Sequence, residues 1–193
     1  GVARGVKKAL IGKVLGPGGG SSDILADAVC WALENCAHVI SMSLGIDFPG
    51  AVARLEGNGF PPELATSVAL QGYRRDILLF DSLAELAVRR SPFKPCMIVA
   101  AAGNESQRDV NAQFEIAVSP PAVAQGMVSV AALGDGAQGF TIASFSNTGA
   151  RLSGPGAGVL SAKVGGGLTA KSGTSMATTH VAGVAALWAE KLL

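Results

Sequence analysis

At 193 residues the chain is long enough for one substantial hydrophobic core, which predicts a single domain. Its composition, 49% hydrophobic and 15% charged, excludes a disordered chain. Lys and Arg number 15 against 14 Asp and Glu, so the charge gives no indication of nucleic acid or an anionic membrane as partner. No apolar run reaches the roughly 18 residues of a spanning helix, so no membrane span is predicted.

Apolar runs that favour strands alternate with segments of helical periodicity along the chain. The strands expected in chain order are 7–16 (KKALIGKVLG, running into a glycine-rich loop), 37–45 (AHVISMSLG), 96–104 (CMIVAAAGN) and 127–134 (MVSVAALG). Helices are expected at 22–35, with Ser22 as N-cap, and at 175–193. Continuous apolar strands alternating with helices predict an α/β fold whose mostly parallel sheet is covered by helices on both faces.

Residues 46–95 interrupt this alternation. The clusters DFPG, EGNGFPPE and RRSPFKP indicate turns, and the stretch 63–90 between the last two has helical spacing, with a break expected near Gly72. Two interpretations remain for this region: a surface elaboration, or a rim that recognises a protein partner.

The segment AKSGTSMATTHVAG places Gly173, Thr174 and Ser175 at the start of the last helix. A serine at a helix N-terminus can act as a nucleophile, because the unpaired backbone N–H groups and the helix dipole stabilise an oxyanion there. The alternative is that Ser175 only caps a buried helix.

Polar groups also follow two of the predicted strands. Asn104 ends the strand 96–104, at the sheet edge where open α/β proteins bind ligands, and its amide could donate to an oxyanion. An ordinary Asx-turn is the alternative for Asn104. The segment Ser43-Leu44-Gly45 ends the strand before it, where an open backbone could pair with an extended peptide.

Together these segments resemble the subtilisin-like serine proteases, the subtilases. GTSMATTHVAG matches the family's serine motif at every fixed position except Thr179, where proline is usual. AAGNE is similar to its oxyanion-hole segment and HVISMSLG to its substrate-binding strand. Residues 1–20 and 140–162 resemble the family's G-V-A-P stretch and its ASFSN…APG region. The resemblance implies an incomplete three-layer (αβα) subtilisin-like fold, in which 1–193 is a partial catalytic domain and 46–95 a family-atypical insertion.

The resemblance also assigns roles to individual residues. It makes Ser175 the acyl nucleophile and Asn104 the side-chain donor to the oxyanion. It implies substrate-binding roles for three segments: Ser43, Leu44 and Gly45; Ala101, Ala102 and Gly103; and the loop Gly18, Gly19 and Gly20. The apolar walls of the first two predict an apolar P1 pocket. No metal site or cofactor is expected, and the odd number of cysteines shows no metal-ligand spacing.

The general base is the part of the triad that the sequence does not offer. Subtilases carry Asp and His motifs before the serine, and no D-T-G, D-S-G or H-G-T occurs here. Of the two histidines, His180 lies about 140° around the last helix from Ser175, which predicts a structural role. His38 begins a strand whose opposite end faces the site, which predicts a surface or edge position. The Asp residues are expected to be solvated charges.

These observations predict a serine endopeptidase that hydrolyses peptide bonds through an acyl-enzyme on Ser175. The chain alone is expected to be inactive, because the triad Asp and His would lie upstream of it. The expected partners are a peptide or protein substrate, and either the missing N-terminal segment or a second copy of the chain. The alternative function is a catalytically inactive, protease-like binding or scaffold domain, which Thr179 slightly favours.

Overall fold

The computed structural model describes residues 2–16, 19–89 and 96–192. Its helices are α1 (Ser22–Glu34), α2 (Phe48–Gly57), α3 (Pro62–Arg89) and α4 (Thr174–Leu192). Its strands are β1 (Val39–Met42), β2 (Met97–Ala101), β3 (Val128–Gly136), β4 (Gly139–Ile142), β5 (Leu152–Pro155), β6 (Val159–Ala162) and β7 (Leu168–Lys171). None of the helices in these ranges is both long and apolar enough to cross a membrane.

The three strands expected in the centre of the chain are confirmed as parallel neighbours. β1 pairs with β2 in the register Val39 to Met97, and β2 pairs with β3 in the register Val99 to Val128. β5 also runs parallel to β3, whereas β4 is antiparallel to it. The main sheet of the described residues is therefore mostly parallel, as expected, with the order β1-β2-β3-β4 and β5 attached to β3.

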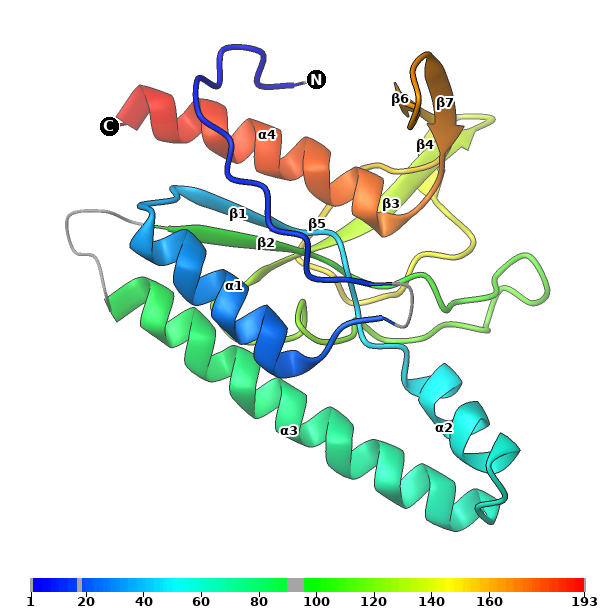
Figure 1. Ribbon diagram of the computed structural model, residues 1–193. Coiled ribbons are helices and arrows are strands. Elements are labelled where there is room, and N and C mark those ends of the chain that lie inside the picture. The colour runs from blue at the N-terminus through cyan, green and yellow to red at the C-terminus, as the bar shows by residue number, and fades with distance from the viewer. Residues whose placement is uncertain (1, 17–18, 90–95, 193) are drawn as a thin grey trace.

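Alternate residues of β2 face two different helical layers. Ile98 and Ala100 pack in a cluster with Phe80 of α3 and with the buried face of α1. Val99 instead packs with Ala177 and its neighbours on α4. Figure 1 shows α4 on one face of the sheet and α1 and α3 on the other, so the three-layer α/β fold is confirmed.

The N-terminus of α1 differs by one residue from the prediction. Ser21 is the N-cap, with extended backbone, and Ser22 is the first helical residue. The Ser22 hydroxyl donates to Asp76 of α3 at 2.5 Å, and this bond joins the two helices on that face. The first-turn carboxylate of Asp23 has a lowered pKa, mainly because the Ser21 side chain hydrogen-bonds to it.

The region 46–95 is more helical than predicted. DFPG is not a turn but the start of α2: the Asp47 carboxylate caps the helix by accepting from Gly50 N–H at 2.8 Å, and proline occupies the first turn. The break expected near Gly72 is also absent, and α3 runs through it for 28 residues. A mid-helix glycine costs only about 1 kcal/mol, which the packing of the buried Phe80 and Leu83 outweighs. From residue 90 on, the predicted RRSPFKP turn lies outside the described residues.

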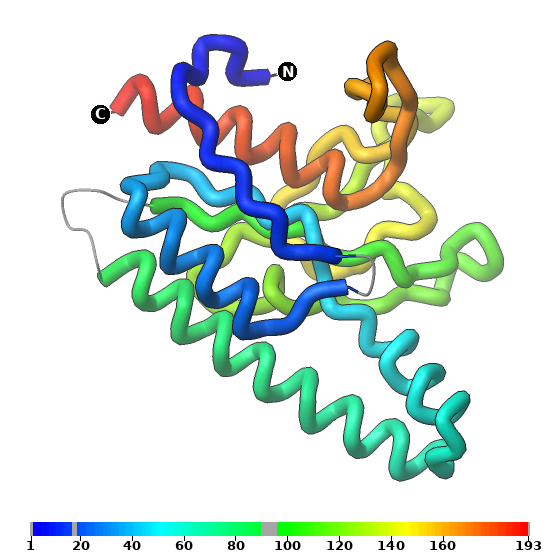
Figure 2. Tube along the Cα trace, in the orientation of Figure 1, coloured from blue at the N-terminus to red at the C-terminus, as the bar shows by residue number. Residues whose placement is uncertain are grey.

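The prediction of a strand at 7–16 is wrong. Residues 6–15 form an irregular trace that passes over the sheet between α1 and α4 (Figure 2). A cavity of about 1200 Å³ lies here, lined by this segment, α1, β1 and α4. A strand needs a neighbouring strand about 4.8 Å away. Here the cavity lies between this segment and β1, where such a neighbour would be. Ile11 of this segment is 84% exposed.

The association of the isolated chain is a prediction that follows from this open region. An unpaired strand edge with apolar surface behind it drives self-association, so we expect the chain to dimerise or form larger species. Size-exclusion chromatography with light scattering measures this directly. Ile11→Asp should raise the monomer fraction, whereas Val164→Asp, at the exposed β6–β7 turn, serves as the control. A monomer of 19.3 kDa at all concentrations, with residues 2–15 protected from hydrogen exchange, would contradict the prediction.

Candidate active site

Three segments far apart in the sequence meet where β1 and β2 end. Parallel strands bring their carboxyl ends to one edge of the sheet, so Ser43 after β1 and Asn104 after β2 come close together. α4 lies along one face of the sheet (Figure 1), and Ser175 is in its first turn. Hydrogen bonds described below link Ser43 to Ser175, and Asn104 to Thr174, the residue before Ser175.

The side-chain amide of Asn104 is oriented by Thr174. Its Oδ1 accepts hydrogen bonds from the Thr174 backbone N–H at 2.8 Å and from the Thr174 hydroxyl at 3.0 Å. A backbone N–H can only donate, so the amide oxygen must face Thr174 and the NH₂ group must point the other way. The two Nδ2 protons are thereby directed away from Thr174, which is the residue before Ser175.

Ser175 lies in the first turn of α4, and its side chain contacts Ser43. The Ser175 hydroxyl donates to the Ser43 carbonyl oxygen at 3.3 Å, and the Ser43 hydroxyl donates to the Ser175 carbonyl oxygen at 3.2 Å. The first N–H groups of a helix have no intrahelical acceptor, and the helix dipole is positive at this end. The hydroxyl and the backbone N–H of Ser175 therefore lie at the positive end of α4, next to the residue that holds the Asn104 amide.

Neither histidine reaches this point. The Nδ1 of His180 lies 2.8 Å from the Met176 carbonyl oxygen one turn earlier, which confirms its structural role. His38 is exposed and precedes β1, so five residues of extended chain, about 16 Å, separate it from Ser43. The expected surface position of His38 is confirmed.

The sequence predicted that all the Asp residues are solvated charges. For two of them this prediction is wrong. Asp76 accepts the Ser22 hydroxyl, and Asp81 accepts the Gln125 backbone N–H at 2.7 Å. Both are partly buried because α3 packs on α1 and on the loop after residue 118. Within the described ranges, no three His, Cys, Asp or Glu side chains are placed to hold a metal ion.

The residues expected to bind substrate differ in their burial and in their distance along the chain from the Asn104 loop. Gly103 has a positive φ of 110° and gives its N–H to the Thr174 hydroxyl at 3.3 Å, so it adjoins Ser175. Ala101 and Ala102 are buried, and the Ala102 carbonyl oxygen already accepts the Ser119 N–H at 3.0 Å. Ser43, Leu44 and Gly45 follow β1 at the surface or half-buried.

The predicted glycine loop is not joined to the other site residues by any hydrogen bond in the described part of the chain. Gly16 and Gly19 exchange two backbone hydrogen bonds with each other, of 2.9 and 3.1 Å. A Cβ on Gly20 would lie 2.6 Å from the Val14 carbonyl oxygen, so the chain has room only for glycine there. Gly18 lies outside the described residues.

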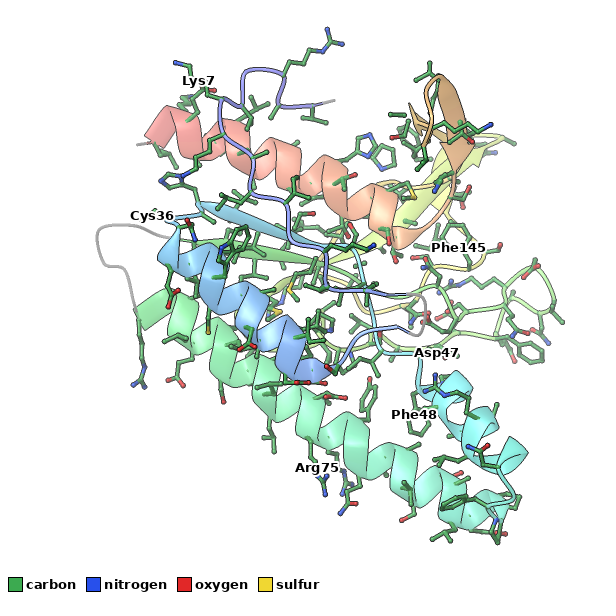
Figure 3. All side chains as sticks on the ribbon, in the orientation of Figure 1. Lys7, Cys36, Asp47, Phe48, Arg75 and Phe145 are labelled. Carbon is green, nitrogen blue, oxygen red and sulfur yellow. The ribbon has the colours of Figure 1, made fainter. Side chains whose placement is uncertain are left out.

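The helices α2 and α3 reach the vicinity of the site. Only two residues separate Gly45 from α2, and Figure 3 shows Asp47 and Phe48 where the chain enters that helix. The Phe48 ring packs edge-on against Tyr73 of α3, with ring centroids 5.6 Å apart. Burial, and secondly the carboxylate of Glu105, raise the pKa of Tyr73, so α3 lies near the loop that carries Asn104.

One residue of the site was missed. Asn147 is fully buried and hydrogen-bonds to both sides of the Asn104 loop. The sequence comparison covered it only as part of residues 140–162. The available signal was an amide residue in an otherwise small or apolar stretch, since a buried amide must find partners.

A serine hydroxyl at a helix N-terminus of an α/β fold, with an asparagine amide nearby, is an arrangement typical of serine hydrolases. The chain belongs to the subtilase family, whose model matches residues 1–192.

Relatives and solved structures agree with this assignment. The chain is 36% identical over 172 residues to the thermostable alkaline protease of Halalkalibacterium halodurans, covering 88% of this chain and 36% of that protein. It is 33% identical to alkaline elastase YaB of Bacillus sp., covering 93% of this chain and 37% of the elastase. Among solved structures, S41 psychrophilic protease superposes with a TM-score of 0.62 at 27% identity, covering 93% of this chain and 53% of that one. The chain thus spans little more than a third of these curated relatives.

Proposed function

We propose that this chain carries the nucleophile and the oxyanion site of a serine endopeptidase that cleaves peptide bonds through an acyl-enzyme. The observation that supports this most is that the Asn104 amide is oriented by Thr174, the residue before Ser175, with its NH₂ group directed away from Thr174. A serine that only caps a helix has no need of an oriented amide donor beside it.

Each residue has a defined part in the proposed reaction. Ser175 Oγ attacks the peptide carbonyl carbon, and its proton passes to a base. The carbonyl oxygen becomes an oxyanion that accepts from Asn104 Nδ2 and the Ser175 N–H. The amine then leaves with a proton, and water hydrolyses the acyl-enzyme. The segments 43–45 and 101–103 would border an apolar P1 pocket.

The base would come from outside this chain. In the described residues the Ser175 hydroxyl donates to the Ser43 carbonyl, which cannot accept a proton at neutral pH. We therefore propose that 1–193 is a partial catalytic domain, completed by a segment that bears the Asp and His motifs. The cavity beside β1 is the place that such a segment, or a second copy of the chain, would fill.

The region 46–95 is proposed as an insertion in this domain. The contact of Phe48 with Tyr73, and the closeness of Tyr73 to Glu105, support a position for α2 and α3 at the rim of the peptide site. The alternative is a surface elaboration with no part in substrate binding. Deletion of 49–61 distinguishes the two, because only the loss of a rim should change the KM of an active form.

A turnover assay of the isolated chain tests the proposed function. With a fluorogenic peptide that has Leu or Phe at P1, we expect no useful hydrolysis, because Ser175 has no base. Loss of triad members in subtilisin, itself a subtilase, leaves at most about 10³–10⁴-fold acceleration over water. Ordinary protease turnover by the isolated chain would contradict the missing base.

A second arm of the same assay separates the protease from the scaffold alternative. A subtilase N-terminal segment with the Asp and His motifs, fused before residue 1 or added during refolding, should give turnover. The same segment with its His changed to Ala is the matched control. A folded complex that remains inactive with the intact segment would favour the inactive, protease-like binding domain instead.

A further inference from the structure

Asn147 is a buried residue that contacts nearly every residue of the loop around Asn104. Its side-chain Oδ1 accepts from the backbone N–H groups of Glu105, at 3.0 Å, and Ser106, at 3.2 Å. Its Nδ2 donates to the Ala102 carbonyl at 3.2 Å. Its own backbone N–H donates to the Gly103 carbonyl at 3.1 Å. Asn104 is the one residue of 102–106 that it leaves to other partners.

Only an asparagine amide satisfies these contacts. The donors Glu105 N–H and Ser106 N–H require an oxygen on one side of the 147 side chain. The Ala102 and Ala117 carbonyls, the latter at 3.3 Å, require a donor on the other side. The Glu105 carboxylate also accepts from Nδ2, at 2.6 Å. An aspartate of the same shape would face two carbonyls and a carboxylate with no proton to give.

The loop is fitted closely around this side chain. A Cβ on Gly103 would lie 2.3 Å from Asn147 Nδ2, and the Gly103 φ of 110° is strained for other residues. The turn therefore bends tightly around the Asn147 amide, and the bend directs the next side chain, Asn104, outward to Thr174.

We propose that Asn147 is a positioning residue, which fixes the 102–106 turn so that the Asn104 amide stays in contact with Thr174 beside Ser175. The importance of this position rests on the proposed oxyanion role of Asn104. The positioning itself is a property of the folded chain and can be measured without catalysis.

Amide hydrogen exchange and ¹⁵N–¹H spectra of the full chain test this proposal. In Asn147→Asp and in Asn147→Ser, which adds no charge, we expect the Thr174 N–H to exchange at least about tenfold faster, because it loses Asn104 as acceptor. The Asn104 side-chain NH₂ signals should shift in the same samples. Protection of the β2 amide of Val99 should stay within about twofold. Asn111→Asp, in an exposed part of the same connection, is the matched control.

Two results would overturn the proposal. One is unchanged Thr174 exchange and unchanged Asn104 signals in both variants. The other is an equal loss of protection at Thr174 and Val99, which would make Asn147 a general stabilising residue. These outcomes are separate from the proposed function, which would fail if Asn104→Ala left the turnover of an active form intact.

Discussion

Replacing Ser175 by alanine is expected to lower kcat by about 10⁶ in any form of the protein that hydrolyses peptides. This is the scale found when the nucleophile of subtilisin, a member of the same family, is removed. The reason is that Ser175 has a partly exposed hydroxyl in the first turn of α4, whereas the neighbouring Thr174 hydroxyl is fully buried and donates to Asn104 Oδ1. Single-turnover and steady-state rates with the fluorogenic peptide measure the effect.

Ser172→Ala is the matched control for this measurement. Ser172 lies three residues earlier, and its hydroxyl accepts the Gly158 N–H at 2.9 Å, away from Asn104. We expect its kcat to remain within about threefold of the parent. Activity of Ser175→Ala within tenfold of the parent would mean that another residue is the nucleophile.

Truncation of Phe80 to alanine is expected to lower the free energy of unfolding by about 3–5 kcal/mol. Phe80 is the largest fully buried side chain, and it lies where α3, α1 and the sheet meet. Domains of ordinary stability have only about 5–15 kcal/mol in total, so the variant should lose a large share of its stability. Urea denaturation followed by circular dichroism gives the change from the midpoint and slope.

The control for the core is Leu78→Ala, two residues earlier on α3, where the side chain is 67% exposed. Its effect should stay within about 0.5 kcal/mol, because little apolar surface is lost from the interior. Equal losses for the two variants would show that α3 does not pack through Phe80 as described.

The central strands and α4 were predictable because the pattern of apolar residues in each indicates how it is buried. Val99 and its neighbours form a run apolar at every position, and such runs occur where both faces of a strand are covered. The strand at 7–16 failed because a strand also requires a partner, which its own residues cannot reveal. The short strands β6 and β7 were missed because nearly all of their side chains are exposed and carry no periodic signal.

The candidate site was only partly predictable. Ser175 and Asn104 stand in motifs whose spacing is local, so the sequence could indicate them. The exchange of hydrogen bonds between Ser43 and Ser175 joins positions 132 apart, and the Asn147 bonds to the Asn104 loop join positions about 40 apart. Contacts at such separations depend on the packing of whole elements, which residue patterns do not encode.

The same separations bear on the order in which the chain folds. Every bond at Ser175 and Thr174 described above, apart from those within α4, reaches back 70 residues or more. Long-range contacts form slowly, because the entropy of closing a long loop must be overcome first. During synthesis α1, β1, α2, α3 and β2 leave the ribosome well before α4. The serine is therefore brought to Asn104 only when α4 docks, so the proposed site stays unassembled until the strands that precede α4 have been made.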